Sequence, residues 1–202
     1  RRWMRQPCAG QRPAAPLTVA SEIRPCDTSL AEVFDAGQRM GTRMMADGIQ
    51  PGDVVGCMLP NWREWLVVAV ATAHAGAVML PIVTIYGAKE LGFILRQSGA
   101  KWLFTPDHFR NADYAAIVAD CQELPGLERH IVTGPEFAAL EAEGPISEAV
   151  FADPEALALL VFTSGTTADP KGVMHSARGL LAELETMRIM RGGSDDDAVI
   201  SP

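Results

Sequence analysis

Between residues 54 and 133, short apolar runs of strand length alternate with longer segments that have helical periodicity. Strands that are buried on both faces read as continuous apolar runs, as these do. The alternation therefore predicts an α/β fold with a largely parallel sheet and helices that cover both of its faces. The expected strands are Val54–Leu59, Val78–Val83, Trp102–Thr105 and Ile131–Thr133.

The first expected helix has the clearest boundaries. Ser29 precedes Glu32 by the spacing of a capping box, and Gly48 supplies a stop. We interpret the stripe of methionines between them as core packing rather than as a binding groove. Asn61 is expected to cap the second helix. The later helices are expected at Trp62–Ala75, Ala88–Gln97, Tyr114–Cys121, Glu136–Glu141 and Ala177–Arg191.

The chain divides into a short lead-in and one larger unit. Residues 1–28 contain prolines but no periodicity, so we expect an extended lead-in. Residues 29–202 carry the pattern of strands and helices. Within this unit, residues 143–154 are the most linker-like and fit either a surface loop or a subdomain boundary. An expected strand at Ala198–Ile200 stops abruptly at Pro202, which favours a truncated domain that continues in a longer protein.

Composition argues against several classes of function. A net charge of −8 disfavours a nucleic-acid partner, because a phosphate backbone requires a basic surface. The 4 cysteines and 4 histidines lie far apart, so neither a disulfide framework nor a metal site is expected. The stretch from Leu66 to Ala88 lacks fixed charge, but Gly76 and Pro81 interrupt it, which favours a buried helix and strand over a transmembrane segment. These features predict a cytoplasmic protein.

One stretch, Leu157–Ser176, concentrates groups that bind anions. The apolar run Leu157–Phe162 leads into a loop of hydroxyl-bearing residues, glycines, a proline and a lysine, and Lys171–His175 suits a second strand. Backbone N–H groups in such a turn form a concave anion site, hydroxyls add donors, and a lysine adds a mobile positive charge. The composition fits two alternatives, a loop for the phosphates of a nucleotide and a hairpin loop without a ligand.

Several better-known motifs do not match this loop. A Walker A loop requires a lysine after its last glycine, but Lys171 precedes Gly172. The G-x-S-x-G nucleophile motif fails because Phe162 occupies the first glycine position before Ser164. The chain also lacks a G-x-G-x-x-G or H-E-x-x-H motif. The loop is therefore expected between two strands, outside these motif classes.

The sequence F-T-S-G-T-T-A-D-P-K-G-V at residues 162–173 resembles the signature phosphate loop of the AMP-forming adenylating enzymes. That superfamily contains acyl-CoA synthetases, firefly-type luciferases and the adenylation domains of peptide synthetases. The resemblance extends over residues 29–202 and implies the partial N-terminal domain of such an enzyme. The further stretches that resemble the acyl-CoA synthetase branch are 48–56, 59–65, 74–82 and 90–101.

The resemblance implies a reaction in two steps. A carboxylic acid attacks the α-phosphorus of ATP, in the presence of Mg²⁺, to give an acyl-adenylate and pyrophosphate, and coenzyme A then displaces AMP. Lys171 and Thr166 are expected to be catalytic, because donors aimed at the departing pyrophosphate lower the barrier. No residue is assigned to the metal. The residues expected to contact the nucleotide are Thr163, Ser164, Gly165, Thr166, Thr167, Pro170, Lys171 and Gly172.

The chain departs from the family pattern in two ways. Ala168 stands where the family usually has glycine, and a left-handed backbone there would cost alanine about 1–2 kcal/mol. The family's later elements, including the ribose-binding aspartate and the lysine of the small C-terminal domain, lie beyond Pro202. We therefore expect the chain alone to be inactive. Two alternatives are a non-catalytic nucleotide-binding relic and an adenylating enzyme with an acceptor other than coenzyme A.

Overall fold

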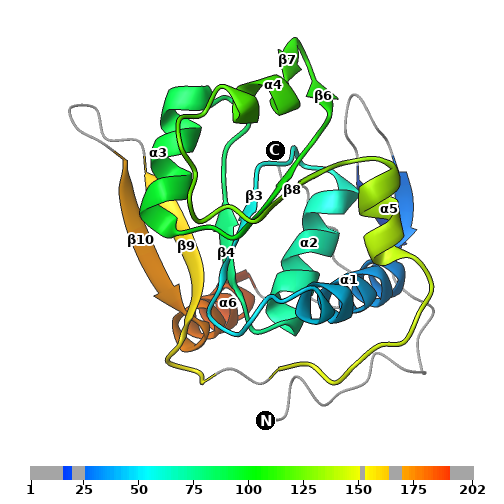
Figure 1. The fold of residues 1–202 in the computed structure, drawn as a ribbon. Coiled ribbons are helices and arrows are strands. Elements are labelled where there is room, and N and C mark those ends of the chain that lie inside the picture. Colours follow the sequence, from blue (N-terminus) through cyan, green and yellow to red (C-terminus); the bar gives the residue numbers. More distant parts are fainter. Residues whose placement is uncertain (1–15, 20–25, 151–152, 164–169, 192–202) are drawn as a thin grey trace.

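A six-stranded sheet forms the centre of the computed structural model, which describes residues 16–19, 26–150, 153–163 and 170–191 (Figure 1). Its strands are β3 (Val54–Cys57), β4 (Val78–Pro81), β5 (Trp102–Thr105), β8 (Arg129–Val132), β9 (Leu157–Thr163) and β10 (Lys171–Ser176). They lie in the order β10-β9-β4-β3-β5-β8. All neighbours pair in parallel except β10, which runs antiparallel to β9. The predicted α/β fold with a largely parallel sheet is confirmed.

Helices cover both faces of this sheet (Figure 1). One face packs against α1 (Leu30–Ala46), α2 (Arg63–His74) and α5 (Pro135–Glu141), and the other against α3 (Ala88–Ser98) and α4 (Tyr114–Ala119). Successive strand residues alternate between the two sides, as the pleat requires. Trp102 and Phe104 join the cluster under α1 and α2, whereas Leu103 joins the cluster under α3. This double burial explains why the strands read as continuous apolar runs.

The start of α1 follows the predicted capping box. The Ser29 hydroxyl accepts a hydrogen bond from the backbone N–H of Glu32 at 3.2 Å, and the Glu32 carboxylate accepts one from the backbone N–H of Ser29 at 2.7 Å. The backbone N–H of Ser29 and its hydroxyl, the latter at 3.0 Å, both donate to the Glu32 carboxylate and hold the pKa of Glu32 below its usual value. Met40 and Met44 are fully buried, which confirms that the methionine stripe packs into the core.

Several predicted boundaries were wrong. Strands β3 and β4 and helix α4 each end two residues earlier than predicted, at Cys57, Pro81 and Ala119. At the starts of α2 and β8, a side-chain contact accompanies the difference. Asn61 does not cap α2; the N-cap is Trp62, which makes no side-chain capping bond. The Trp62 ring is buried against Phe109, with 5.7 Å between the ring centroids, so its burial fixes where the helix starts. Strand β8 begins at Arg129 rather than Ile131, because the Arg129 guanidinium lies 4.7 Å above the ring of Trp102 and extends the pairing.

Smaller elements complete the fold. Within the lead-in, β1 (Pro16–Val19) and β2 (Cys26–Ser29) pair as antiparallel strands. A second short pair, β6 (His108–Phe109) and β7 (Ala112–Asp113), precedes α4. The last described helix is α6 (Ala177–Arg191), and the strand expected at residues 198–200 lies outside the described residues.

Two further sequence predictions concern the membrane and the cysteines. In the described part of the chain, no helix is long and apolar enough to cross a membrane. Cys57 and Cys121 are free thiols. Burial raises the pKa of both thiols, so neither is an activated nucleophile. Cys8 and the side chain of Cys26 lie outside the described residues.

Two glycines allow α1 and α2 to pack closely. A Cβ added at Gly37 would lie 2.5 Å from Cβ of Val70, and one added at Gly41 would lie 2.7 Å from the carbonyl oxygen of Ala71. Real Cβ atoms do not approach so closely, so either side chain would push the helices apart. The approach of these helices therefore depends on having no side chain at these two positions.

We expect Gly37→Ala to destabilise the fold by about 1–3 kcal/mol, the usual cost of overpacking a core. Gly92→Ala is the matched control, because a Cβ there meets the mobile end of Arg96, at 3.1 Å, and not the backbone. Alanine also has the higher helix propensity, so Gly92→Ala should be neutral or stabilising. Urea unfolding followed by circular dichroism measures both, and equal stabilities of the two variants would contradict the packing argument.

Candidate functional site

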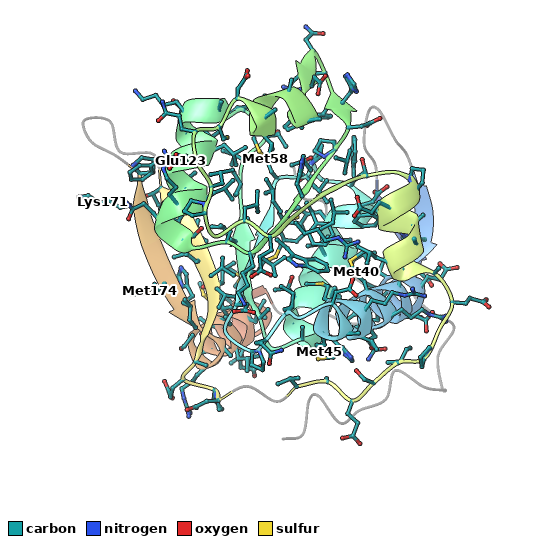
Figure 2. The ribbon with its side chains drawn as sticks, viewed as in Figure 1. Met40, Met45, Met58, Glu123, Lys171 and Met174 are labelled. Atoms are coloured by element: carbon teal, nitrogen blue, oxygen red, sulfur yellow. The ribbon has the colours of Figure 1, made fainter. Side chains whose placement is uncertain are left out.

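The expected phosphate loop connects two paired strands. Thr163 at the end of β9 lies opposite Lys171 at the start of β10, and this pair closes the hairpin. The Thr163 hydroxyl donates a hydrogen bond of 3.4 Å to the carbonyl oxygen of Lys171. Figure 2 shows Lys171 at the loop end of β10 and Met174 farther along the same strand. The two predicted strands are confirmed, and residues 164–169 between them lie outside the described part of the chain.

The next pair in the hairpin joins an aromatic ring to a glycine. Phe162 lies opposite Gly172, and a Cβ added at Gly172 would lie 3.4 Å from Cζ of Phe162 and 3.2 Å from Cδ1 of Leu160. Phe162 also packs against the core cluster under α3. The ring therefore fills the space that the glycine leaves and connects the hairpin to the core.

The structure describes four of the eight residues expected at the nucleotide. Thr163, Lys171 and Gly172 are exposed, and Pro170 is partly buried, so the hairpin end is open to a ligand from solvent. Thr163 and Lys171 are brought together as a strand pair, from opposite ends of the loop. The expected site residues outside the described part of the chain are Ser164, Gly165, Thr166 and Thr167, together with the neighbouring Ala168.

The loop leaves the sheet at the edge where open α/β sheets bind their ligands. In the sheet, the chain passes from β3 to β4 on one side of β3 and continues with β5 and β8 on the other side. Ligands of open α/β sheets usually bind outside the carboxyl ends of the strands where the order reverses in this way, here between β3 and β5. Here buried side chains fill that position, because Met58, Leu59 and Trp62 follow β3 and Pro106 follows β5. The hairpin of β9 and β10 lies beyond β4, and β9 ends at the same edge of the sheet. Its end is therefore the remaining candidate position for a ligand at this edge.

A segment that leaves the sheet at the same edge as β9 was missed by sequence reasoning. Because β9 and β4 are parallel, the chain leaves both strands at the same edge of the sheet, and β4 continues into residues 82–87. The buried Tyr114 donates its hydroxyl hydrogen to the carbonyl oxygen of Thr84 at 2.9 Å, which fixes this segment. Val83 and Ile85 are 53% and 82% exposed there. The sequence signal that could have pointed to this segment is the presence of two large apolar residues, Val83 and Ile85, directly after β4.

The described residues offer little other site chemistry. They contain no group of three or more histidine, cysteine or acidic residues placed to hold a metal ion. Burial lowers the pKa of His130, whose Nε2 lies 2.8 Å from the hydroxyl of Thr105 inside the fold. Thr105 is fully buried and His130 is partly buried, and the two side chains form a hydrogen bond with each other. The hairpin end is thus the best-supported candidate site among the described residues, and the sequence of its loop predicts an anion-binding site.

Comparison with known proteins gives a consistent result. Residues 8–202 match the family model described as AMP-binding enzyme. A 3-[(3aS,4S,7aS)-7a-methyl-1,5-dioxo-octahydro-1H-inden-4-yl]propanoyl:CoA ligase of Mycobacterium tuberculosis is 36% identical over 163 residues, which cover 75% of this chain and 32% of the ligase. The phosphinothricin tripeptide synthetase PhsC of Streptomyces viridochromogenes is 34% identical over 154 residues, which cover 74% of this chain and 13% of the synthetase.

A solved structure agrees with these relatives. The acyl-CoA synthetase of Brucella canis superposes with a TM-score of 0.75 and 25% identity, over 94% of this chain and 35% of the synthetase. The chain spans about a third of the length of the curated CoA ligases that it matches. The family match covers nearly the whole chain, and the hairpin lies within it. The chain therefore belongs to the AMP-binding enzyme family, whose members similar to it include acid–CoA ligases.

Proposed function

We propose that this chain is the N-terminal portion of an acid–CoA ligase and that the loop between β9 and β10 holds the phosphates of ATP. The complete enzyme would join a carboxylic acid to AMP, release pyrophosphate, and transfer the acyl group to coenzyme A. The observation that carries the proposal is the exposed Thr163–Lys171 pair, which closes the end of a hairpin whose sequence resembles the family's signature loop. The acyl-CoA ligases among the relatives support a carboxylic acid as substrate.

The chemistry of the hairpin end fits this step. When the carboxylate attacks the α-phosphorus, the bond to the bridging oxygen breaks and negative charge builds on the departing pyrophosphate. Lys171 supplies a positive charge, and the hydroxyls and backbone N–H groups of residues 163–167 would supply donors around the β- and γ-phosphates. Thr166 and Lys171 are the proposed catalytic residues. A hydrogen bond to a charged group contributes about 1.5–3 kcal/mol, so several together stabilise the leaving group strongly.

Mg²⁺ enters the proposal only together with ATP. The described residues do not form a carboxylate or histidine cluster that would hold the ion by itself. Mg²⁺ commonly keeps several waters and binds through the phosphates of its substrate, so the ion can arrive with the nucleotide. We therefore assign no residue of the described chain to the metal.

Lys171→Ala should reduce acyl-adenylate formation by about 10²–10³-fold, the usual cost of losing one donor to a developing charge. The measurement is carboxylate-dependent exchange of pyrophosphate into ATP, in a version of the protein completed to the length of its relatives. Lys101→Ala is the control, because Lys101 pairs with Asp53 at the opposite edge of the sheet. An unchanged exchange rate in Lys171→Ala would remove this residue from the site.

The 202-residue chain by itself should not support this exchange. It covers about a third of the related ligases, so a substrate bound at the hairpin would lack most of the surroundings that those enzymes provide. Circular dichroism of the same sample checks that the chain is folded. Exchange by the short chain would show that the claim of inactivity is wrong, and a completed but inactive protein would favour the non-catalytic alternative.

A second candidate differs only in the acceptor of the acyl group. The similarity to the peptide synthetase PhsC favours it, because peptide synthetases contain adenylation domains in the same superfamily. The Brucella canis structure and the CoA ligases of the comparison favour coenzyme A. Mass spectrometry of the product distinguishes the two: an acyl-CoA thioester supports the ligase, and an adenylate that persists in the presence of coenzyme A supports the alternative.

A further inference from the structure

The loop end of the hairpin extends past the pair that ties it to the rest of the sheet. The register between β4 and β9 joins Met79 to Leu159, whereas β9 and β10 pair as far as Thr163 and Lys171. Strand β10 is the outermost strand of the sheet (Figure 1), and its residues Lys171–Met174 are exposed. A two-stranded ribbon is marginally stable by itself and twists strongly. Side-chain packing is therefore needed to fix where the end of β10 lies.

Two side chains of β9 supply this packing. Leu160 is part of the core cluster under α3, and Phe162 packs against the same cluster. Both side chains lie on one face of the hairpin, because residues two positions apart on a strand share a face. Opposite Phe162, the paired residue of β10 is Gly172, which has no side chain. The ring of Phe162 can therefore lie directly against the backbone of β10.

The space above Gly172 is filled by these two side chains. A Cβ added at Gly172 would lie 3.2 Å from Cδ1 of Leu160, and 3.4 Å and 3.7 Å from Cζ and Cε1 of Phe162. The two shorter distances lie below the usual separation of carbon atoms in contact, about 3.5–4.0 Å. Because Phe162 is held by the core, its ring limits how closely the backbone of residue 172 can approach β9.

A hydrogen bond holds the same peptide unit from its other side. The Thr163 hydroxyl donates to the carbonyl oxygen of Lys171 at 3.4 Å, and this carbonyl belongs to the peptide bond between Lys171 and Gly172. Thr163 thus contacts the peptide unit at its oxygen, and the ring of Phe162 lies next to its Gly172 end. The backbone of Lys171 is therefore fixed by β9, whereas Lys171 itself is exposed.

We propose that Phe162 is a positioning residue for Lys171, because its ring, held by the core under α3, sets where the peptide unit between Lys171 and Gly172 lies. The inference rests on the proposed function, in which Lys171 stabilises the departing pyrophosphate. Phe162 acts through Lys171 and does not touch the nucleotide. Misplacing a reacting group by about 1 Å can lower a rate about 10²-fold, so a contact that sets the backbone of Lys171 affects the reaction.

The pairing of a ring with a glycine makes a demand on size. A smaller residue at position 162 leaves a gap over Gly172, and a larger residue at position 172 pushes β10 away from the ring. The two changes displace Lys171 in opposite directions, so together they restore the spacing. Gly172 lies within strand β10, where alanine adopts the same extended backbone, so its replacement acts through the contact with Phe162.

Phe162→Leu and Gly172→Ala test this pair in a version of the protein completed to the length of its relatives. Phe162→Leu removes the ring atoms that face Gly172, and Gly172→Ala adds the methyl group that meets them. Each change should lower carboxylate-dependent exchange of pyrophosphate into ATP, at saturating substrates, about tenfold. The double variant should recover to within about threefold of the parent protein. Losses that multiply in the double variant would overturn the proposal.

The Lys171→Ala background separates positioning from a general loss of structure. If Phe162 acts through Lys171, Phe162→Leu should cause no further loss of exchange in Lys171→Ala. A further loss by the same factor in both backgrounds would mean a purely structural role and would contradict the proposal. An unchanged rate in Lys171→Ala would overturn the role of Lys171 together with its positioning. A reduced rate there, with unchanged rates in Phe162→Leu and Gly172→Ala, would overturn the positioning alone.

Val173→Ala is the matched control on the same strand. Val173 follows Gly172, is 41% exposed, and lies opposite Val161 with its side chain on the other face of the hairpin. The change should keep the exchange rate within about twofold, and its effect should add to that of Phe162→Leu without interaction. A tenfold loss in Val173→Ala would show that any change on β10 lowers the rate and would contradict a specific role of the ring.

The contact itself can be measured in the 202-residue chain without catalysis. Nuclear Overhauser effects between the ring hydrogens of Phe162 and the α hydrogens of Gly172 should be present in the parent chain and in Val173→Ala. This measurement keeps the test decisive if Phe162→Leu does not fold. Absence of these effects in the folded parent chain would overturn the packing from which the positioning of Lys171 is inferred.

Discussion

The parallel pairing of β9 with β4 is the contact on which the candidate site depends. It joins Met79 to Leu159, residues that lie far apart in the chain, and through it the hairpin becomes part of the sheet. Without this pairing, β9 and β10 would form a two-stranded hairpin, which is marginally stable by itself in water. With it, Thr163 and Lys171 stand at the carboxyl edge of a sheet that is covered on both faces.

The hairpin is fixed at both ends by different kinds of interaction. Near the loop, packing dominates, because Phe162 lies over Gly172 and against the core under α3. At the base, hydrogen bonds and an ion pair dominate, because Arg178 binds both Pro154 and Glu155. The hairpin is therefore held by apolar packing at its loop end and by polar contacts at its base.

Local patterns in the sequence predicted the sheet, the helices and the outline of the hairpin. Apolar runs, the capping box at Ser29 and the helix stop at Gly48 act over a few residues, so their signals are visible in the sequence. The start of α2 was missed because it depends on Trp62 meeting Phe109, a contact made only in the folded chain. Boundaries set by such contacts carry no local signal.

The position of residues 142–150 along α1 and α2 could not be predicted from the sequence for the same reason. Thr42, His74 and Ser147 are ordinary polar residues in their own segments, and the separation between Thr42 and Ser147 is 105 residues. Residues 143–154 look like a linker because they lack periodicity, yet backbone and side-chain hydrogen bonds hold several of them on α1 and α2. Polar segments without periodicity can be ordered when buried helices offer acceptors to their N–H groups.

The net charge of the protein limits how the proposed site can attract its ligand. The 202 residues carry a charge of −8, and ATP is itself a polyanion, so the net charge of this chain repels ATP. Salt screens this repulsion beyond about 8 Å at physiological ionic strength. Several acidic groups are also paired away from the hairpin, as Arg129 shows with Asp47 and Glu136. Attraction to the proposed site would therefore have to come from groups within a few ångströms of the phosphates, and the exposed Lys171 is the cation that the described end of the hairpin offers.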